Sequence, residues 1–164
     1  MKQLNEKAAA VFGTLMDAMT RGCLQVFNKP HLPLALDNIY DARLPLYGPA
    51  EVYHLCHHFI QDGHVVEDPS MFFAVVDNRQ KSGGMDQLIV IPVSLRHDGR
   101  YEANCVMNDD EFVSFDEQLQ NRHVDFAESW MQNIVRHGYL DRIAQDTPVQ
   151  LDEDDTGCEE CTAF

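Results

Sequence analysis

With 164 residues, of which 45% are hydrophobic and 24% charged, the chain is long enough for one domain with a proper core and has the composition of a soluble globular protein. No apolar run approaches the roughly 18 residues that a membrane span needs, and the N-terminus carries charge where a signal peptide needs its apolar segment, so we expect a cytoplasmic protein. The formal net charge of −15 argues against direct binding to nucleic acid or to anionic membranes.

The N-terminal segment is predicted to form an amphipathic helix over residues 4–21, because its apolar residues recur at helical spacing and Gly22 supplies a stop. Two short extended segments follow, over residues 23–28 and 34–40. Prolines beside them keep both short, and at least one is expected to be an edge strand.

Residues 51–107 read as the centre of the fold, because strand-like runs alternate there with turn-forming clusters. Four strands are predicted, over residues 52–60, 71–76, 87–95 and 100–107. The links between them are short, as at His97-Asp98-Gly99, and short links favour antiparallel pairing.

Two details place individual strands within that sheet. Residues 71–76 are apolar on both faces, which indicates a central strand that is entered through Asp68-Pro69. Pro92 within the third predicted strand indicates an edge position or a bulge.

The C-terminal part is predicted to be helical. Ser114 followed three residues later by Glu117 has the spacing of a capping box, an apolar stripe runs from Leu119 to Val135, and Gly138 ends it. The sequence therefore predicts a single α+β domain over residues 1–145, in which an N-terminal and a C-terminal helix pack on an antiparallel sheet of four to six strands. Residues 146–164 are expected to form an acidic, disordered tail.

Two segments of the predicted sheet carry a family resemblance. Residues 62–73 (DGHVVEDPSMFF) place a glycine turn before an Asp-Pro-x-Met-x-Phe strand, and residues 91–102 (IPVSLRHDGRYE) place a Pro-Val-Ser strand before a Gly-x-Tyr hairpin. Over residues 62–102 the chain resembles an uncharacterised family, a domain of unknown function, of small proteins from bacterial plasmids, integrated elements and phages. It departs from that pattern at Ser70, where an acidic residue is expected. The resemblance implies a mobile-element setting and supplies no catalytic residues.

A histidine-rich run suggests a metal site. In a strand, His54, Cys56 and His58 point to one side, and His64 follows just after the turn. Imidazole nitrogens and a thiolate are ligands that zinc prefers, so these four residues are candidate zinc ligands. The alternative is a polar sheet face that binds no metal, since no second compact ligand pair lies nearby in the sequence.

The five cysteines do not read as a disulfide framework, because their number is odd and their spacing wide. Cys23, Cys56 and Cys105 lie in strand-like runs and are expected to be small buried hydrophobes. Cys158 and Cys161 have the spacing of a zinc knuckle or a dithiol centre. Acidic neighbours disfavour the thiolate there, so an accidental motif in the tail is the preferred interpretation.

Acidic residues dominate the C-terminal third, where residues 98–145 hold 10 acidic and 4 basic side chains. Carboxylates spaced along a rigid scaffold can imitate the phosphates of a nucleic acid and occupy a basic cleft. The alternative is simple solubility. The candidate partner-binding carboxylates are Asp98, Glu102, Asp109, Asp110, Glu111, Asp116, Glu117, Asp125 and Glu128.

No nucleotide-binding loop, nucleophile elbow or catalytic triad is recognisable, so an enzyme is the less favoured class, and no catalytic residues and no cofactor are predicted. The leading hypothesis is a non-enzymatic, acidic accessory protein of a mobile element that binds a basic, nucleic-acid-binding protein. Its sharpest form is a nucleic-acid-mimicking inhibitor of a host defence or restriction system. The alternative hypothesis is a small zinc enzyme or metal-binding regulator, and a homodimer joined through an exposed sheet edge is a third.

Overall fold

The computed structural model describes residues 1–82 and 87–146. These residues form an α+β fold with eight strands in one mixed sheet, three helices of eight residues or more, and a single helical turn. The strands are β1 Cys23–Val26, β2 Leu34–Leu44, β3 Gly48–Gln61, β4 His64–Asp77, β5 Leu88–His97, β6 Arg100–Ala103, β7 Cys105–Asn108 and β8 Glu111–Phe115. The helices are α1 Glu6–Asp17, α2 Arg79–Ser82, α3 Glu117–Arg136 and α4 Tyr139–Asp146.

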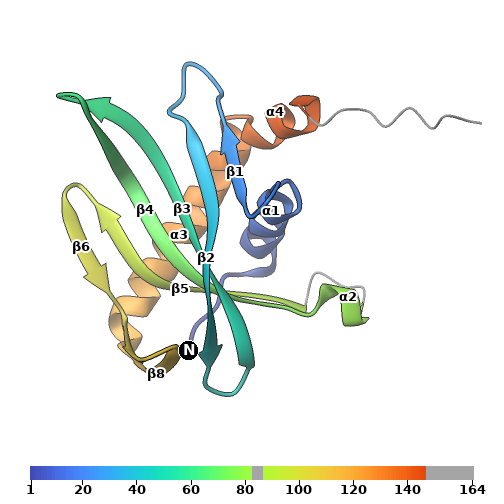
Figure 1. Ribbon diagram of the computed structural model, residues 1–164, viewed down its shortest axis with the longest axis vertical. Coiled ribbons are helices and arrows are strands. Elements are labelled where there is room, and N and C mark those ends of the chain that lie inside the picture. The colour runs from blue at the N-terminus through green and yellow to red at the C-terminus, as the bar shows by residue number, and fades with distance from the viewer. Residues whose placement is uncertain (83–86, 147–164) are drawn as a thin grey trace, which may run out of the picture.

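The α+β class is confirmed, but the sheet is larger than the predicted four to six strands and is not wholly antiparallel. Its strand order is β6-β5-β4-β3-β2-β8-β7, and β1 also pairs with β2. The parallel contact joins β2 to β8 through Arg43 and Glu111. Because β6 and β7 are consecutive in the chain but stand at opposite ends of this order, the sheet has to curl (Figure 1).

The larger core lies between the sheet and the helices. In Figure 1, α3 crosses behind the strands, and α1 lies beside it. Alternate residues of β3 and β4, such as Leu55, Met71 and Phe73, pack against Phe12 of α1 and Trp130 of α3. Phe12 stands edge-on to Tyr53, with the ring centroids 6.1 Å apart.

A second core fills the opposite face of the sheet, inside its curl. Val52, Ala74 and Ile91 are fully buried there, and none of the residues in this cluster comes from a helix. Phe112 of β8 closes it from the far end of the sheet. The prediction of a central strand at residues 71–76 is therefore confirmed, since β4 sends buried side chains into both cores.

The helix boundaries follow local capping. Asn5 caps α1 by accepting a hydrogen bond from the Ala8 N–H, and Asp116 caps α3 by accepting one from Leu119. Gly138, with a positive φ, follows the end of α3 as predicted. The predicted capping box was wrong, because Ser114 lies in β8 and the helix begins after Asp116.

Several strand boundaries also differ from the sequence prediction. The predicted strand over residues 100–107 bends at Asn104, where the chain leaves β5 and begins to pair with β8. Asp68-Pro69 lies inside β4 and does not begin it. Pro92 lies at a bulge between β4 and β5, one of the two predicted alternatives, and β5 is not an edge strand.

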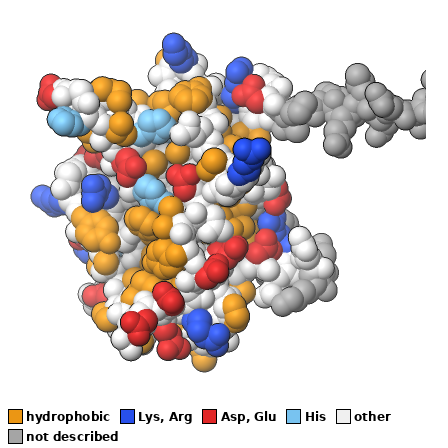
Figure 2. All heavy atoms as spheres, in the orientation of Figure 1, with side chains coloured by type: hydrophobic (Ala, Val, Ile, Leu, Met, Phe, Trp, Pro, Cys, Tyr) orange, Lys and Arg blue, Asp and Glu red, His pale blue; other side chains and the backbone are white. Residues whose placement is uncertain are grey.

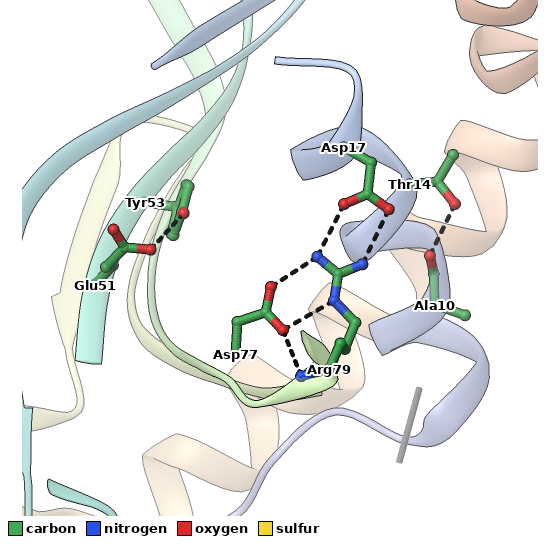
Figure 3. A network of polar contacts seen from close by, with 7 residues as sticks. All are labelled: Ala10, Thr14, Asp17, Glu51, Tyr53, Asp77 and Arg79. Atoms are coloured by element: carbon green, nitrogen blue, oxygen red, sulfur yellow. Dashed lines mark hydrogen bonds and ion pairs between the residues drawn. The ribbon is translucent and has the colours of Figure 1, made fainter. Parts of the chain in front are cut away.

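Arg79 joins the end of β4 to the end of α1 (Figure 3). Its guanidinium donates to Asp77 at 2.7 and 2.9 Å and to Asp17 at 2.9 and 3.0 Å, and its side chain is only 17% exposed. These hydrogen bonds hold the pKa of Asp77 below its usual range. The short turn α2 thereby positions α1 against the sheet.

The predicted tail lies mostly outside the described residues. Asp146, its first residue, ends α4, and residues 147–164 are not described. The Cys158 and Cys161 pair therefore lies outside the described part of the chain.

Candidate functional site

The nine predicted partner-binding carboxylates are spread over three elements. Asp98 and Glu102 lie at the β5–β6 hairpin, and Asp109, Asp110 and Glu111 form the turn into β8. The remaining four lie at the start or along the length of α3: Asp116, Glu117, Asp125 and Glu128.

Five of these carboxylates already have partners within the chain, and one of them, Asp98, lies 3.6 Å from His97 Nε2. Asp116 caps α3, and Glu128 accepts a hydrogen bond from the Asn5 N–H at 2.8 Å. Glu102 lies 3.5 Å from the Arg122 guanidinium, and Asp125 lies 3.9 Å from Lys2 Nζ. Their positions are explained by the fold itself.

The carboxylates of the turn between β7 and β8 differ from these partnered carboxylates. Asp109, Asp110 and Glu111, which we call the acidic turn, are exposed and make no ion pair within the described residues. The turn lies beside the β2–β3 hairpin, because the Arg43 N–H donates to the Asp110 carbonyl at 2.8 Å. At the tip of that hairpin the Leu46 side chain is 97% exposed. The turn and its surroundings therefore combine free carboxylates with exposed apolar surface.

Figure 2 shows the face of the sheet that is turned away from α3. Acidic side chains surround a strip of apolar ones on this face, with a few basic side chains at its margins. A surface of this kind combines long-range attraction for a basic partner with apolar area that can be buried on contact.

Of the four predicted zinc ligands, two lie close together. His54 and Cys56 of β3 point away from the helices, and Glu67 of β4 joins them, so that one donor atom of each lies within 4.8 Å of the others. His54 Nε2 is 2.9 Å from Ser70 Oγ and 3.7 Å from Glu67 Oε2, and its ring stacks on Phe72.

The carboxylates near this cluster disfavour a free thiolate at Cys56 and would stabilise a bound cation. Burial raises the pKa of the Cys56 thiol to about 12, and the Glu67 and Asp37 carboxylates add to the shift. Burial lowers the pKa of His54, and the same two carboxylates oppose that effect. Without a metal, Cys56 is therefore a protonated thiol and His54 a neutral imidazole at neutral pH.

His58 and His64 do not join this cluster. The β3–β4 register slips between Cys56 and His58. Among the described residues, no ring nitrogen of His58 or His64 belongs to the group of donor atoms that lie within 4.8 Å of one another. Glu67, which no sequence pattern singles out, lies in this group instead. The signal that could have found it is cross-strand pairing, since Glu67 stands opposite His58 in the hairpin.

A second titratable group lies where the β5–β6 hairpin meets α3. His97 Nδ1 is 2.9 Å from Asp68 Oδ1, and the Asp98 N–H donates to Asp68 Oδ2 at 3.0 Å. Asp68 and His97 stand 29 positions apart in the sequence, so only the pairing of β4 with β5 brings them together.

His123 of α3 lies at the other side of the same junction and is fully buried. The Asn104 amide nitrogen donates to the Pro92 carbonyl at 2.9 Å and lies 2.9 Å from His123 Nδ1. Burial lowers the pKa of His123, and the nearby Glu102 partly offsets this. The sequence placed this residue only within the predicted C-terminal helix and gave no sign of its partner.

The family comparison covers most of the chain. Residues 6–140 match a family described as a domain of unknown function, DUF6908. The chain belongs to this family. No curated protein and no solved structure matches it. The expected membership of an uncharacterised family is therefore confirmed.

The DUF6908 match begins at the first residue of α1 and ends within α4. It includes every strand, the acidic turn, the His54 cluster and the junction between the hairpin and α3. Over the described residues, no helix of the DUF6908 chain combines the length and apolar character that crossing a bilayer requires.

Proposed function

We propose that this DUF6908 protein is a non-enzymatic, acidic accessory protein of a mobile element, and that it binds a basic surface of another protein. The single observation that carries the proposal is the acidic turn, whose three carboxylates are exposed and make no ion pair within the described residues. In its sharpest form, the partner is a nucleic-acid-binding protein of a host defence or restriction system, which the carboxylates inhibit by imitating phosphates.

The charge of the whole chain supports this direction of binding. A net charge of −15 attracts a basic surface over about a Debye length, which is about 8 Å at physiological salt. Such steering raises association rates and weakens as salt is added. It also keeps the chain away from nucleic acid itself.

Exposed apolar side chains near the acidic turn supply the short-range part of the interface. Val106 and Val113 are 57% and 49% exposed on β7 and β8, the strands that the turn joins. Burying such side chains stabilises a complex more than rim charges do. Leu46 adds a protruding apolar contact beside them.

A pull-down from host lysate with the untagged protein, at low and at high salt, tests the proposal. The triple variant Asp109→Asn, Asp110→Asn, Glu111→Gln should lose a nucleic-acid-binding protein that the wild type retains at low salt. The matched control is Glu6→Gln, Asp62→Asn, Asp141→Asn, which changes net charge equally at exposed positions elsewhere. Retention of the same partner by the acidic-turn variant would contradict the proposal.

A second candidate function is metal binding, and the gathering of His54, Cys56 and Glu67 favours it. An imidazole, a thiolate and a carboxylate would give zinc three protein ligands. The fourth position of a tetrahedral ion would stay open, as in catalytic zinc sites. A bound zinc ion would deprotonate the Cys56 thiol. The negative charge of Glu67, which disfavours a free thiolate, would then stabilise the bound cation. This is the alternative of a small zinc enzyme or regulator.

Elemental analysis of protein purified without a metal-affinity tag tests the second candidate. About one zinc per chain is expected in the wild type, and Cys56→Ser should remove it. His58→Gln is the matched control, because His58 is a histidine of the same strand outside the cluster. Less than about 0.1 metal per chain in the wild type would rule the site out, given the affinity of protein zinc sites.

A further inference from the structure

A cleft of about 580 Å³ lies between the β5–β6 hairpin and α3, and we call it the hairpin–helix cleft. Its apolar surface comes from Leu95 of β5 and Phe126 of α3. Its polar lining includes Arg100, Arg122 and His123, together with Glu102. The volume is within the range of small-molecule sites, and six of the eight lining residues are polar.

One polar atom of this lining is buried and has no hydrogen-bond acceptor. The Asn104 amide nitrogen bonds the Pro92 carbonyl, which fixes its orientation, so it donates its second hydrogen to His123 Nδ1. His123 therefore carries its proton on Nε2. That atom finds no hydrogen-bond partner among the described residues, because Glu102 Oε2 lies 3.6 Å away.

A buried donor without an acceptor costs about 1–3 kcal/mol. Of the five buried polar side-chain atoms without a hydrogen-bond partner among the described residues, His123 Nε2 is the one that belongs to the lining of the cleft. A ligand oxygen in the cleft would supply the missing acceptor. Since burial keeps His123 neutral, its Nε2–H is present as a donor at neutral pH.

Two arginines, Arg100 and Arg122, line the cleft around this donor together with two carboxylates, Asp98 and Glu102. Arg100 makes no ion pair within the described part of the chain, so its guanidinium is available to a ligand. Arg122 is 69% exposed and lies 3.5 Å from Glu102, so it can turn toward a ligand at little cost. Guanidinium groups bind carboxylates through paired hydrogen bonds.

We propose that the hairpin–helix cleft binds a small organic acid, whose carboxylate accepts hydrogen bonds from His123 Nε2 and from Arg100 and Arg122. The organic part of the ligand packs on Leu95 and Phe126. This site is separate from the acidic turn and does not depend on the proposed protein partner.

Three probes of the same shape and different charge test the proposal: benzoate, benzamide and benzamidine. In nuclear magnetic resonance spectra of the imidazole nitrogens, free His123 should show the Nε2–H tautomer. Benzoate should shift the His123 and Phe126 signals in a saturable way, and benzamide should bind more weakly. Saturable binding of benzamidine in place of benzoate would overturn the proposal, because Asp98 and Glu102 would then decide the specificity of the cleft.

Exposed arginines allow matched variants that keep the fold. Arg100→Gln and Arg122→Gln should each weaken benzoate binding about tenfold or more, the effect of losing one charged hydrogen bond. Arg136→Gln removes the same charge from an exposed position at the end of α3, outside the cleft, and should leave binding unchanged. Equal weakening by all three variants, or no shift of His123 up to the solubility limit of benzoate, would overturn the proposal.

Discussion

The carboxylates at the hairpin–helix cleft have partners within the chain, and those of the acidic turn have none among the described residues. At the cleft, the lining residue His97 is bound by Asp68 of β4, and Glu102 lies beside both Arg122 and His123. At the acidic turn, three adjacent carboxylates make no ion pair within the described residues. Both regions derive from one stretch of chain, since the β5–β6 hairpin and the β7–β8 turn are joined through a single residue, Asn104.

Carboxylates that are paired within the chain stabilise the fold, whereas unpaired carboxylates are available to a partner. Paired and buried groups position secondary structure, and their loss leaves a polar atom unsatisfied. Unpaired exposed carboxylates contribute little to stability and their electrostatic interactions are open to a second molecule. The two regions should therefore respond very differently to substitution.

The largest effect is expected at Asn104, which is 1% exposed. Asn104→Ala leaves the Pro92 carbonyl and His123 Nδ1 without their donor, so the free energy of unfolding should fall by about 2–5 kcal/mol in a urea titration. Asn108→Ala is the control, because Asn108 is exposed at the end of β7. Equal, small losses in both variants would show that the Asn104 network contributes nothing to stability.

Acidification should have the next largest effect. His57 is a half-buried residue of β3, and its Nδ1 lies 3.1 Å from the Pro33 carbonyl oxygen. Burial lowers the pKa of His54, His57 and His123 from the ordinary value of 6.5, so the unfolded chain binds protons more tightly than the folded one. Stability is then complete above about pH 6.5 and falls as the pH drops below it, at no more than about 1.4 kcal/mol per pH unit for each histidine.

Urea titrations at pH 7, 6 and 5 measure this loss. Titrations between pH 7 and 8.5 serve as the control, because the protonation of these three histidines changes much less there than between pH 7 and 5. A flat profile from pH 7 to pH 5 would contradict the burial of neutral histidines.

A smaller loss is expected for Asp68→Asn, which weakens the hydrogen bonds to His97 and to the Asp98 N–H. These bonds tie the hairpin tip to β4, so about 1–2 kcal/mol of stability should be lost. Asp98→Asn is the matched control, because that side chain is 85% exposed. Thermal unfolding of both variants at pH 7 measures the difference, and a larger loss for Asp98→Asn would reverse the roles assigned here.

The smallest effect is expected at the acidic turn. Neutralising Asp109, Asp110 and Glu111 should change the free energy of unfolding by less than about 0.5 kcal/mol per substitution, in either direction. The same variant should lose its protein partner, so stability and binding would be separated in one molecule. A loss of several kcal/mol in a urea titration would place the acidic turn among the structural charges.

The sequence predicts those parts of the fold that local chemistry determines. Asp62-Gly63 and Asp98-Gly99 turn hairpins because both residues of each pair adopt a positive φ, and Gly138 follows the end of α3 for the same reason. The apolar stripe of α3 is likewise readable from helical spacing. Each of these features depends on residues within a few positions of one another.

Features that depend on distant pairing were not predictable. Residues 111–115 form a strand because β2 and β7 lie on either side of them, which no local signal reveals. Glu67 joins His54 and Cys56 through a slip in the β3–β4 register. His123 becomes a buried neutral donor only because Asn104, on a different element, lies against it.

The bend at Asn104 also sets the order in which the sheet can assemble. Strands β2 to β6 pair with sequence neighbours, so these hairpins close short loops and should form early. The contact between Arg43 and Glu111 closes a far longer loop and can form only after the chain has passed from one edge of the sheet to the other. In a pulsed hydrogen-exchange experiment during refolding, the Arg43 amide, which donates to the Asp110 carbonyl, should therefore become protected later than the amides of the hairpins between β2 and β6.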